Sequence, residues 1–271
     1  MKAFMSRAAL AGLLLGASML ASAADIPRTP APADAKVFIV SPADGATVDK
    51  TFKVKFAVEG IALAPAGDQT ANQFLCHAIR EQRPDDGLLS EEEKDNRERL
   101  SKSRVWIIDP VDGTREYGEE RTDWAVHVAL AIDGRPEIGA VALPGLDLVL
   151  RTDRPQPLAT GPKTPRMVVS RTRPAREALD VAEKIGAELV PMGSAGAKAM
   201  AIVRGDAEIY LHTGGQYEWD SCAPAAVALA HGLHVSRIDG SPMMYNQADV
   251  YMPDLLICRP EWAERVLSLL G

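Results

Sequence analysis

Two short segments near the start of the chain have apolar patterns typical of strands, and a helical pattern follows them. The segments that predict β-strands are Lys36–Val40, which is largely apolar, and Phe52–Val58, in which apolar and polar positions alternate. In Thr70–Gln82 the apolar positions recur at helical spacing and form one stripe, made of Phe74, Leu75, Ala78 and Ile79. The change of period near Ala66–Gly67 indicates a boundary between a short β segment and a separate globular part.

After a polar, acidic loop, apolar runs predict first a sheet and then alternating strands and helices. The strands of the first sheet are Val105–Ile108, Trp124–Ile132, Ile138–Leu143 and Leu146–Arg151. Asp133–Gly134 joins the second and third of these strands as a hairpin turn. The later strands are Met167–Ser170, Glu188–Val190, Glu208–His212 and Leu255–Cys258, and the helices are Arg176–Ile185, Ala195–Val203, Ser221–His231 and Pro260–Leu270. Such alternation is typical of an α/β layer.

The first 23 residues have the composition of a secretory signal peptide. Lys2 and Arg7 accompany an apolar run at Ala8–Leu20, and Ala21–Ala23 offers small residues for cleavage. No later stretch reaches the roughly 18 apolar residues that a transmembrane helix needs. We therefore expect export to a periplasm and no transmembrane segment after cleavage. The expected divisions are a signal peptide at 1–23, a linker with a short β segment at 24–66, and subdomains at 67–152 and 153–271.

Charge and cysteine content limit the class of partner. The chain has 30 basic and 37 acidic residues, a formal net charge of −7. An acidic protein is poorly suited to a nucleic-acid polymer. The cysteines Cys76, Cys222 and Cys258 match no zinc-binding spacing, and each is predicted to be a small buried apolar group. Unpaired cysteines suit a reducing compartment, which is at odds with export.

The candidate chemistry lies in Trp106–Thr114. A buried strand delivers Asp109 to its end and Asp112 follows three residues later, so two carboxylates can share hard divalent cations, which prefer oxygen ligands. Gly113 and Thr114 then open a predicted helix whose free N–H groups can hold a phosphate. Taken alone, these residues are equally typical of ordinary turns and helix caps.

Three motifs in order along the chain resemble the signature of the inositol monophosphatase superfamily. They are Ser90-Glu91-Glu92, Asp109-Pro110-Val111-Asp112-Gly113-Thr114, and Trp219-Asp220 with Ala223 and Gly232. Gly193–Lys198 and Gly214–Asp220 are similar to the CysQ-type bacterial 3′(2′),5′-bisphosphate nucleotidases. The similarity runs from about Gly67 to the C-terminus. It implies an α/β (α+β) fold, a layered αβαβα sandwich of the inositol monophosphatase/fructose-1,6-bisphosphatase type, preceded by a short N-terminal β segment.

The resemblance also implies a site, in which roughly two or three Mg²⁺ ions promote in-line attack of water on a phosphate monoester. The implied metal ligands are Glu91, Asp109, Asp112, Asp220 and the carbonyl of Val111. The implied catalytic residues are Asp68 and Thr114, the phosphate-binding residues are Gly113 and Thr114, and the substrate-binding residues are Ser194, Lys198 and Glu218. The implied partner is a small phosphorylated substrate, usually 3′-phosphoadenosine 5′-phosphate, a cytoplasmic by-product of sulfur assimilation.

The N-terminus departs from this family, whose members begin with a long helix and a strand pair. Residues 24–66 instead resemble the start of an exported bacterial β-domain of unknown function. Either the strands within 36–58 replace the missing packing surface, or the protein is an inactive exported remnant; inositol monophosphatase activity is a further alternative. A haloacid-dehalogenase-type phosphatase is disfavoured because one residue separates its two aspartates, whereas Pro110 and Val111 both separate Asp109 from Asp112.

Overall fold

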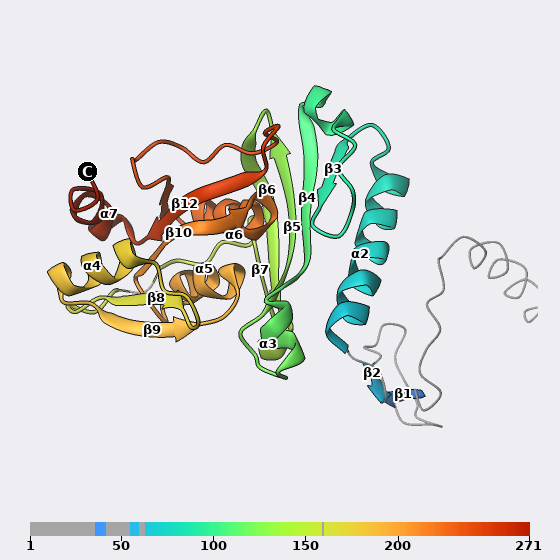
Figure 1. The fold of residues 1–271 in the computed structure, drawn as a ribbon, viewed down its shortest axis with the longest axis horizontal. Helices are drawn as coiled ribbons and strands as arrows, with labels where there is room; N and C mark the ends of the chain where they lie inside the picture. Colours follow the sequence, from blue (N-terminus) through green and yellow to red (C-terminus); the bar gives the residue numbers. More distant parts are fainter. Residues whose placement is uncertain (1–35, 42–54, 60–62, 159) are drawn as a thin grey trace, which may run out of the picture. The chain divides into compact units, whose positions relative to one another are not determined.

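A computed structural model describes residues 36–41, 55–59, 63–158 and 160–271 (Figure 1). The chain divides into two units, residues 1–61 and 62–271. In the first unit β1 (Lys36–Ser41) pairs antiparallel with β2 (Lys55–Glu59), which confirms a strand in each of the two predicted segments. The predicted signal peptide at 1–23 and the stretch 24–35 lie outside the described residues.

The second unit contains two five-stranded sheets. The first sheet has the order β3-β4-β5-β6-β7, in which β3 is parallel to β4 and the other neighbours are antiparallel. Its strands are β3 (Gly87–Ser90), β4 (Arg104–Asp112), β5 (Ala125–Ile132), β6 (Arg135–Leu143) and β7 (Leu148–Arg151).

The second sheet has the order β11-β12-β10-β8-β9. Strands β9, β8 and β10 are parallel, whereas β12 is antiparallel to both of its neighbours. The strands are β8 (Arg166–Ser170), β9 (Glu188–Met192), β10 (Ile209–Tyr217), β11 (His234–Ser236) and β12 (Tyr251–Cys258).

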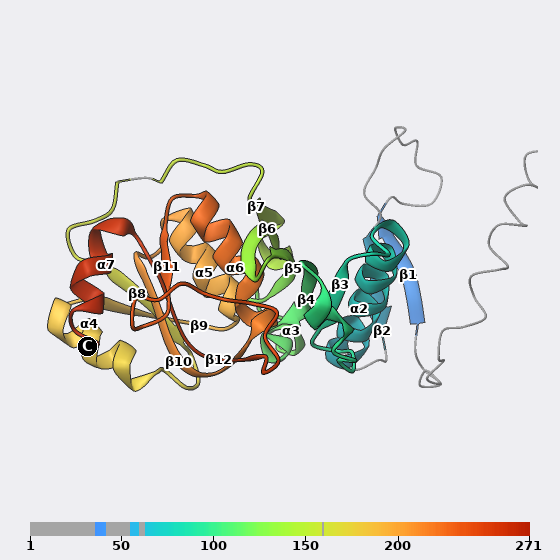
Figure 2. The same ribbon diagram turned by 90° about the horizontal axis from the view of Figure 1, so that it is seen from above.

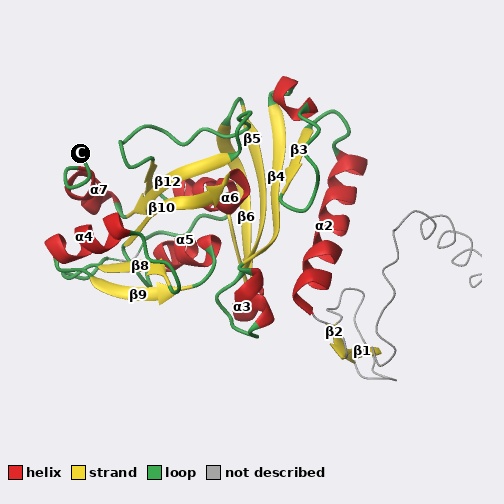
Figure 3. Ribbon diagram, viewed as in Figure 1, coloured by secondary structure: helices red, strands yellow, loops and turns green. Residues whose placement is uncertain are grey.

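Helices cover both sheets and fill the space between them (Figures 2 and 3). The long helices are α2 (Leu63–Gln82), α4 (Arg176–Ile185), α5 (Ala195–Arg204), α6 (Glu218–Ala230) and α7 (Pro260–Leu267), and α3 (Thr114–Gly118) is a single short turn after β4. Helices α5 and α6 pack between the sheets, α2 covers the outer face of the first sheet, and α4 and α7 cover the second. This α–β–α–β–α order confirms the predicted layered sandwich.

The main core lies where the two sheets face α5 and α6. Its buried members include Ile107 of β4, Met200 of α5, Val227 of α6 and Leu255 of β12. A second apolar cluster joins the outer face of the second sheet to α4 and α7, and Val181 of α4 belongs to it. Helix α4 has the bounds that its apolar spacing predicts, because its buried side chains recur at helical intervals.

Helix α2 buries only part of the apolar stripe that its sequence predicts, because Leu75, Ala78 and Ile79 are half-buried and Phe74 is exposed. It begins at Leu63 rather than at Thr70, and Phe74 is 72% exposed. The buried side chains are instead Asp68, Asn72 and Cys76, which recur every four residues. This partly polar face is the one that α2 turns inward, towards the first sheet.

Other differences concern short or irregular strands. The pair Leu88–Leu89 belongs to β3, and neither β3 nor β11 is among the predicted strands. Pro110 does not end β4, which continues to Asp112 through an irregularity in its pairing with β5. The hairpin at Asp133–Gly134 is confirmed, with positive φ at both residues, as a two-residue turn of this type requires. Within the described ranges, every helix is too short or too polar to cross a bilayer.

Candidate functional site

Three carboxylates converge at the end of β4 and the start of α6. Asp109, Asp112 and Asp220 each offer an oxygen within 4.8 Å of the other two. Asp109 is 1% exposed, and its Oδ1 atom is buried without a hydrogen-bond partner. Burial and the neighbouring carboxylates raise the pKa of Asp109 well above its ordinary value and that of Asp220 to about 7. A buried oxygen without a donor, among like charges, fits a divalent cation, which prefers such ligands.

Asp112 differs from Asp109 because donors surround it. Its Oδ2 atom accepts hydrogen bonds from Ser194 Oγ (2.5 Å) and Gly196 N (2.6 Å), and its Oδ1 accepts one from Ala195 N (3.1 Å). His127 Nε2 lies 3.2 Å from Oδ2. Burial alone would raise the pKa of Asp112, but contact with His127 and these hydrogen bonds outweigh burial and lower it to about 2. Asp112 therefore stays ionised and is fixed to the first turn of α5.

Glu91 follows β3 and lies beside this cluster, although it is not one of the three carboxylates within 4.8 Å. Burial, with the charges of Asp220 and Asp68, raises its pKa to about 7, even though much of the residue is open to solvent. Its position is supported from α2, because Asn72 Oδ1 accepts a hydrogen bond from Ser90 Oγ at 2.7 Å.

Asp68 and Thr114 form a pair at the edge of the cluster. Asp68 lies on α2, and its Oδ2 accepts a hydrogen bond from Thr114 Oγ1 at 3.4 Å, while Thr114 Oγ1 also lies 3.1 Å from the carbonyl oxygen of Val111. Asp68 Oδ1 is buried without a hydrogen-bond partner. Burial, followed by the charge of Glu92, raises the pKa of Asp68 to about 6. The pair can therefore accept a hydrogen bond from a water molecule.

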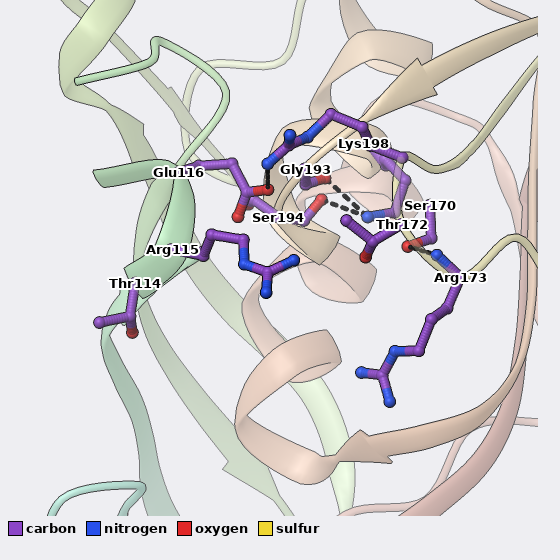
Figure 4. A pocket seen from close by; sticks show the side chains of 11 residues that line it. Thr114, Arg115, Glu116, Ser170, Thr172, Arg173, Gly193, Ser194 and Lys198 are labelled. Carbon is purple, nitrogen blue, oxygen red and sulfur yellow. Dashed lines mark hydrogen bonds and ion pairs between the residues drawn. The ribbon is translucent and has the colours of Figure 1, made fainter. Parts of the chain in front are cut away.

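A cavity of about 440 Å³ opens next to these residues (Figure 4). Gly113 and Thr114 form one wall, and the loop after β8 forms another. Four cationic side chains line it: Arg115, Arg171, Arg173 and Lys198. Arg171 forms ion pairs with Glu116 and Glu119, both at 2.8 Å. For Arg115 and Arg173 we find no ion pair within the part of the chain that the structure describes, so their charges are available to an anion.

The three residues expected to bind substrate have different surroundings. Lys198 is buried and lines the cavity, and its Nζ donates to the carbonyl oxygens of Gly193 and Ser194, both at 2.7 Å. Burial lowers the pKa of Lys198 to about 8. The Ser194 hydroxyl lies between Asp112 and the N–H of Ala197, where it caps α5.

Glu218 does not line the cavity. It is fully buried, and its carboxylate accepts hydrogen bonds from the backbone N–H groups of Asn246 (2.7 Å) and Gln247 (2.6 Å). With both oxygens engaged in this way, Glu218 fixes a loop to the start of α6.

Sequence reasoning missed His127 and the arginines of the loop after β8. His127 occupies an inward position of β5, between Ala125 and Ala129. A polar side chain at a position that the alternation assigns to the core is the sequence feature that could have identified it. Arg171 and Arg173 follow the carboxyl end of a strand with parallel neighbours, a place where ligands often bind in α/β sheets.

Several known proteins are similar to this chain in sequence. The sequence model of the inositol monophosphatase family matches residues 43–270, so the match begins ahead of Gly67. A 3′-phosphoadenosine 5′-phosphate phosphatase of Mycobacterium leprae is 51% identical over 223 residues, which cover 77% of this chain and 82% of that protein. A 3′(2′),5′-bisphosphate nucleotidase CysQ of Escherichia coli is 27% identical over 199 residues, covering 69% of this chain and 81% of that protein.

Solved structures show the same fold. CysQ from Bacteroides thetaiotaomicron has a TM-score of 0.63 at 25% identity, over 71% of this chain and 83% of that one. An inositol monophosphatase from Anabaena has a TM-score of 0.63 at 21% identity, over 77% and 87% of the two chains. The family match covers most of the chain, and the relatives and the layered fold agree with it. This chain therefore belongs to the inositol monophosphatase family.

Proposed function

We propose that this protein is a Mg²⁺-dependent phosphomonoesterase that hydrolyses 3′-phosphoadenosine 5′-phosphate to AMP and phosphate. The observation that carries the proposal is the cluster of the buried Asp109 and Asp112 with the half-buried Asp220, which offer oxygens within 4.8 Å of one another next to a cationic cavity. The name of the Mycobacterium leprae relative, at 51% identity, supports the choice of substrate.

The acidic residues are proposed to hold the cations. Asp109, Asp112 and Asp220 would be ligands, joined by Glu91 and the carbonyl of Val111. The unpartnered Oδ1 of Asp109 fits this role, since the buried charge otherwise has no compensation. Divalent cations held there supply positive charge for the phosphate and for the entering and leaving oxygens.

Asp68 and Thr114 are proposed to act on the attacking water. The free Oδ1 of Asp68 can accept a proton from water as the water oxygen attacks phosphorus, while Thr114 keeps the carboxylate in place. The bond from phosphorus to the ribose oxygen breaks, and that oxygen takes a proton from solvent water and leaves as a hydroxyl group, while Asp68 releases its proton to solvent. Backbone N–H groups of Gly113 and Thr114 would hold the phosphate from the cavity wall.

The cavity is proposed to take the remainder of the substrate, including its second phosphate. Arg115 and Arg173 carry the available positive charge, and Lys198 has one N–H not used by its two carbonyl contacts. Glu218 is omitted from the proposed substrate contacts because its carboxylate is engaged elsewhere.

Phosphate release from 3′-phosphoadenosine 5′-phosphate and from inositol 1-phosphate tests the proposal, with Mg²⁺ varied and Asp109→Asn as the control. Mg²⁺-dependent release that the variant loses supports the carboxylate site, and preference for the bisphosphate supports the substrate. Preference for inositol 1-phosphate would indicate that the protein is an inositol monophosphatase instead. A folded chain that releases no phosphate from either compound would be an inactive member of the family.

The compartment is a separate proposal. Because residues 1–23 combine a basic start, an apolar run and small residues at the cleavage position, we propose that they direct export. Cell fractionation with N-terminal sequencing tests this. A periplasmic chain that begins at Ala24 supports export, and a cytoplasmic chain that keeps its first residues contradicts it.

A further inference from the structure

We propose that His127 is a positioning residue that holds Asp112 and the first turn of α6 in a fixed relation, and so sets the geometry in which Asp112 and Asp220 bind divalent cations. The inference rests on the proposed metal site and adds a residue that the family motifs do not contain. It is carried by the contacts of one fully buried ring.

The ring reaches two elements that each supply a carboxylate. His127 Nδ1 lies 2.9 Å from the carbonyl oxygen of Trp219, the residue before Asp220, and Nε2 lies 3.2 Å from Asp112 Oδ2. A carbonyl oxygen only accepts, so Nδ1 carries the proton of this hydrogen bond. Nε2 approaches Asp112 closely but makes no hydrogen bond of good geometry. The imidazole of β5 is therefore hydrogen-bonded to the start of α6 and in close contact with the end of β4.

Strand register places the same histidine beside the third carboxylate. His127 of β5 is paired directly with Asp109 of β4, and directly opposed residues of antiparallel strands project to the same face. The ring is thus adjacent in the sheet to Asp109, while its two nitrogens contact Asp112 and the segment that carries Asp220.

Helix α5 closes the remaining side and leaves the ring no room to move. A Cβ atom at Gly196 would lie 2.0 Å from His127 Nε2 and 2.9 Å from Cε1, so this position of α5 accepts only glycine while the ring is in place. Gly196 N also donates to Asp112 Oδ2 at 2.6 Å. Three elements, β4, α5 and α6, therefore meet on one imidazole.

His231 shows what a purely structural histidine looks like in this chain. It is also buried, and its Nδ1 contacts the carbonyl oxygen of Val227 at 2.7 Å, four residues earlier at the other end of α6. None of its contacts within the described ranges involves a carboxylate of the cluster. His231→Asn is therefore a matched control for loss of a buried histidine.

Two neutral substitutions separate the two contacts of His127. In His127→Asn the amide lies near the place of Nδ1 and retains a donor for Trp219, whereas in His127→Gln the longer side chain reaches the place of Nε2 and Asp112. We expect His127→Asn to weaken Mn²⁺ binding, measured by calorimetry without substrate, about 10- to 100-fold, the usual effect of removing a group that orients a ligand. His127→Gln should retain more of the affinity, and KM for the phosphorylated substrate should change little.

The control variants distinguish a role of His127 in positioning the metal ligands from a role in packing alone. His231→Asn should lower Tm in the metal-free chain without changing Mn²⁺ affinity. If His127→Asn and His127→Gln lower Tm but bind Mn²⁺ as tightly as the unmodified chain, His127 is a core residue and the inference is wrong. If the unmodified chain itself binds no Mn²⁺, the proposed metal site fails, and that result is distinct from the failure of His127 alone.

Discussion

Two aspartates three residues apart show how surroundings assign different tasks to one chemical group. Asp112 accepts hydrogen bonds from a side chain and two backbone N–H groups, and its pKa is lowered to about 2. Asp109 is equally buried but has an oxygen with no donor, and its pKa is raised. The first carboxylate is stabilised by the protein itself, whereas the second needs a cation from outside.

Asp109→Asn should therefore separate stability from metal binding. The amide replaces a buried carboxyl group whose ionised form the metal-free chain does not stabilise, so Tm without divalent cations should rise by a few degrees, as expected for a gain of roughly 1 kcal/mol. Thermal unfolding with and without Mg²⁺ checks this. In the unmodified chain Mg²⁺ should raise Tm, whereas in the variant it should not. A variant that Mg²⁺ still stabilises would contradict the role of Asp109.

The raised pKa values of the cluster predict the pH dependence of metal-free stability. The pKa of Asp220 is about 7 in the folded chain, against 3.8 ordinarily, so its protonated form is favoured by folding. Its contribution to stability is complete below about pH 4 and is lost as pH rises through about 7. Chelated protein should therefore lose stability from pH 4 to pH 7, and Asp220→Asn should reduce the slope. Urea unfolding across this range measures it, and an unchanged slope would contradict the assignment.

At the level of elements, the sequence predicts those helices and strands whose apolar residues recur at regular spacing. Helix α4 and the β5–β6 hairpin follow from apolar spacing and from Asp133–Gly134. The strand β3 is four residues long and owes its conformation to parallel pairing with β4, which no local pattern encodes. The face of α2 that packs against the first sheet is partly polar, so an apolar stripe alone does not identify that face.

Prediction of the site is limited in the same way, because a local pattern does not encode contacts between distant segments. The motifs locate Asp109, Asp112 and Asp220 because these residues lie in short stretches of sequence in the last part of β4 and the first turn of α6. The contacts of His127 and Glu218 depend instead on segments far away in the sequence. The partner of His127 lies 92 residues away at Trp219, and that of Glu218 lies 28 residues away at Asn246.

Two substitutions on α2 test which face of that helix matters. Asn72→Ala removes the acceptor of the Ser90 and Cys76 hydrogen bonds in a buried place, and we expect a loss of about 1–3 kcal/mol in the free energy of unfolding. Because Ser90 precedes Glu91, the variant should also need more Mg²⁺ for half-maximal activity. Phe74→Ala, on the exposed face of the same helix, should change stability by no more than about 0.5 kcal/mol. Urea unfolding and Mg²⁺ titration of activity measure these effects, and the reverse order of the two variants would mean that α2 packs through Phe74.

At the scale of the whole molecule, the site is a junction that no single layer contains. The first sheet contributes β4 and the end of β3, the middle layer contributes the first turns of α5 and α6, and α2 adds Asp68 from the outer layer. The cavity then extends to the loop after β8 in the second sheet. The carboxylates thus lie towards the first sheet, whereas the cationic side chains of the cavity come from α3, from α5 and from the loop after β8.

This division predicts that substrate preference can change without loss of the chemistry. Arg173 lines the cavity from the second sheet, whereas the carboxylates come from other elements, so Arg173→Ala should raise KM for 3′-phosphoadenosine 5′-phosphate. Loss of a charged hydrogen bond worth about 1.5–3 kcal/mol corresponds to roughly 10- to 100-fold. KM for inositol 1-phosphate, which has no second phosphate, should stay nearly constant. Arg176→Ala, three residues later on α4 and paired with Asp180, is the matched control and should alter neither KM. Equal losses with both substrates would place Arg173 at the reacting phosphate instead, and the second phosphate would then need another partner in the cavity.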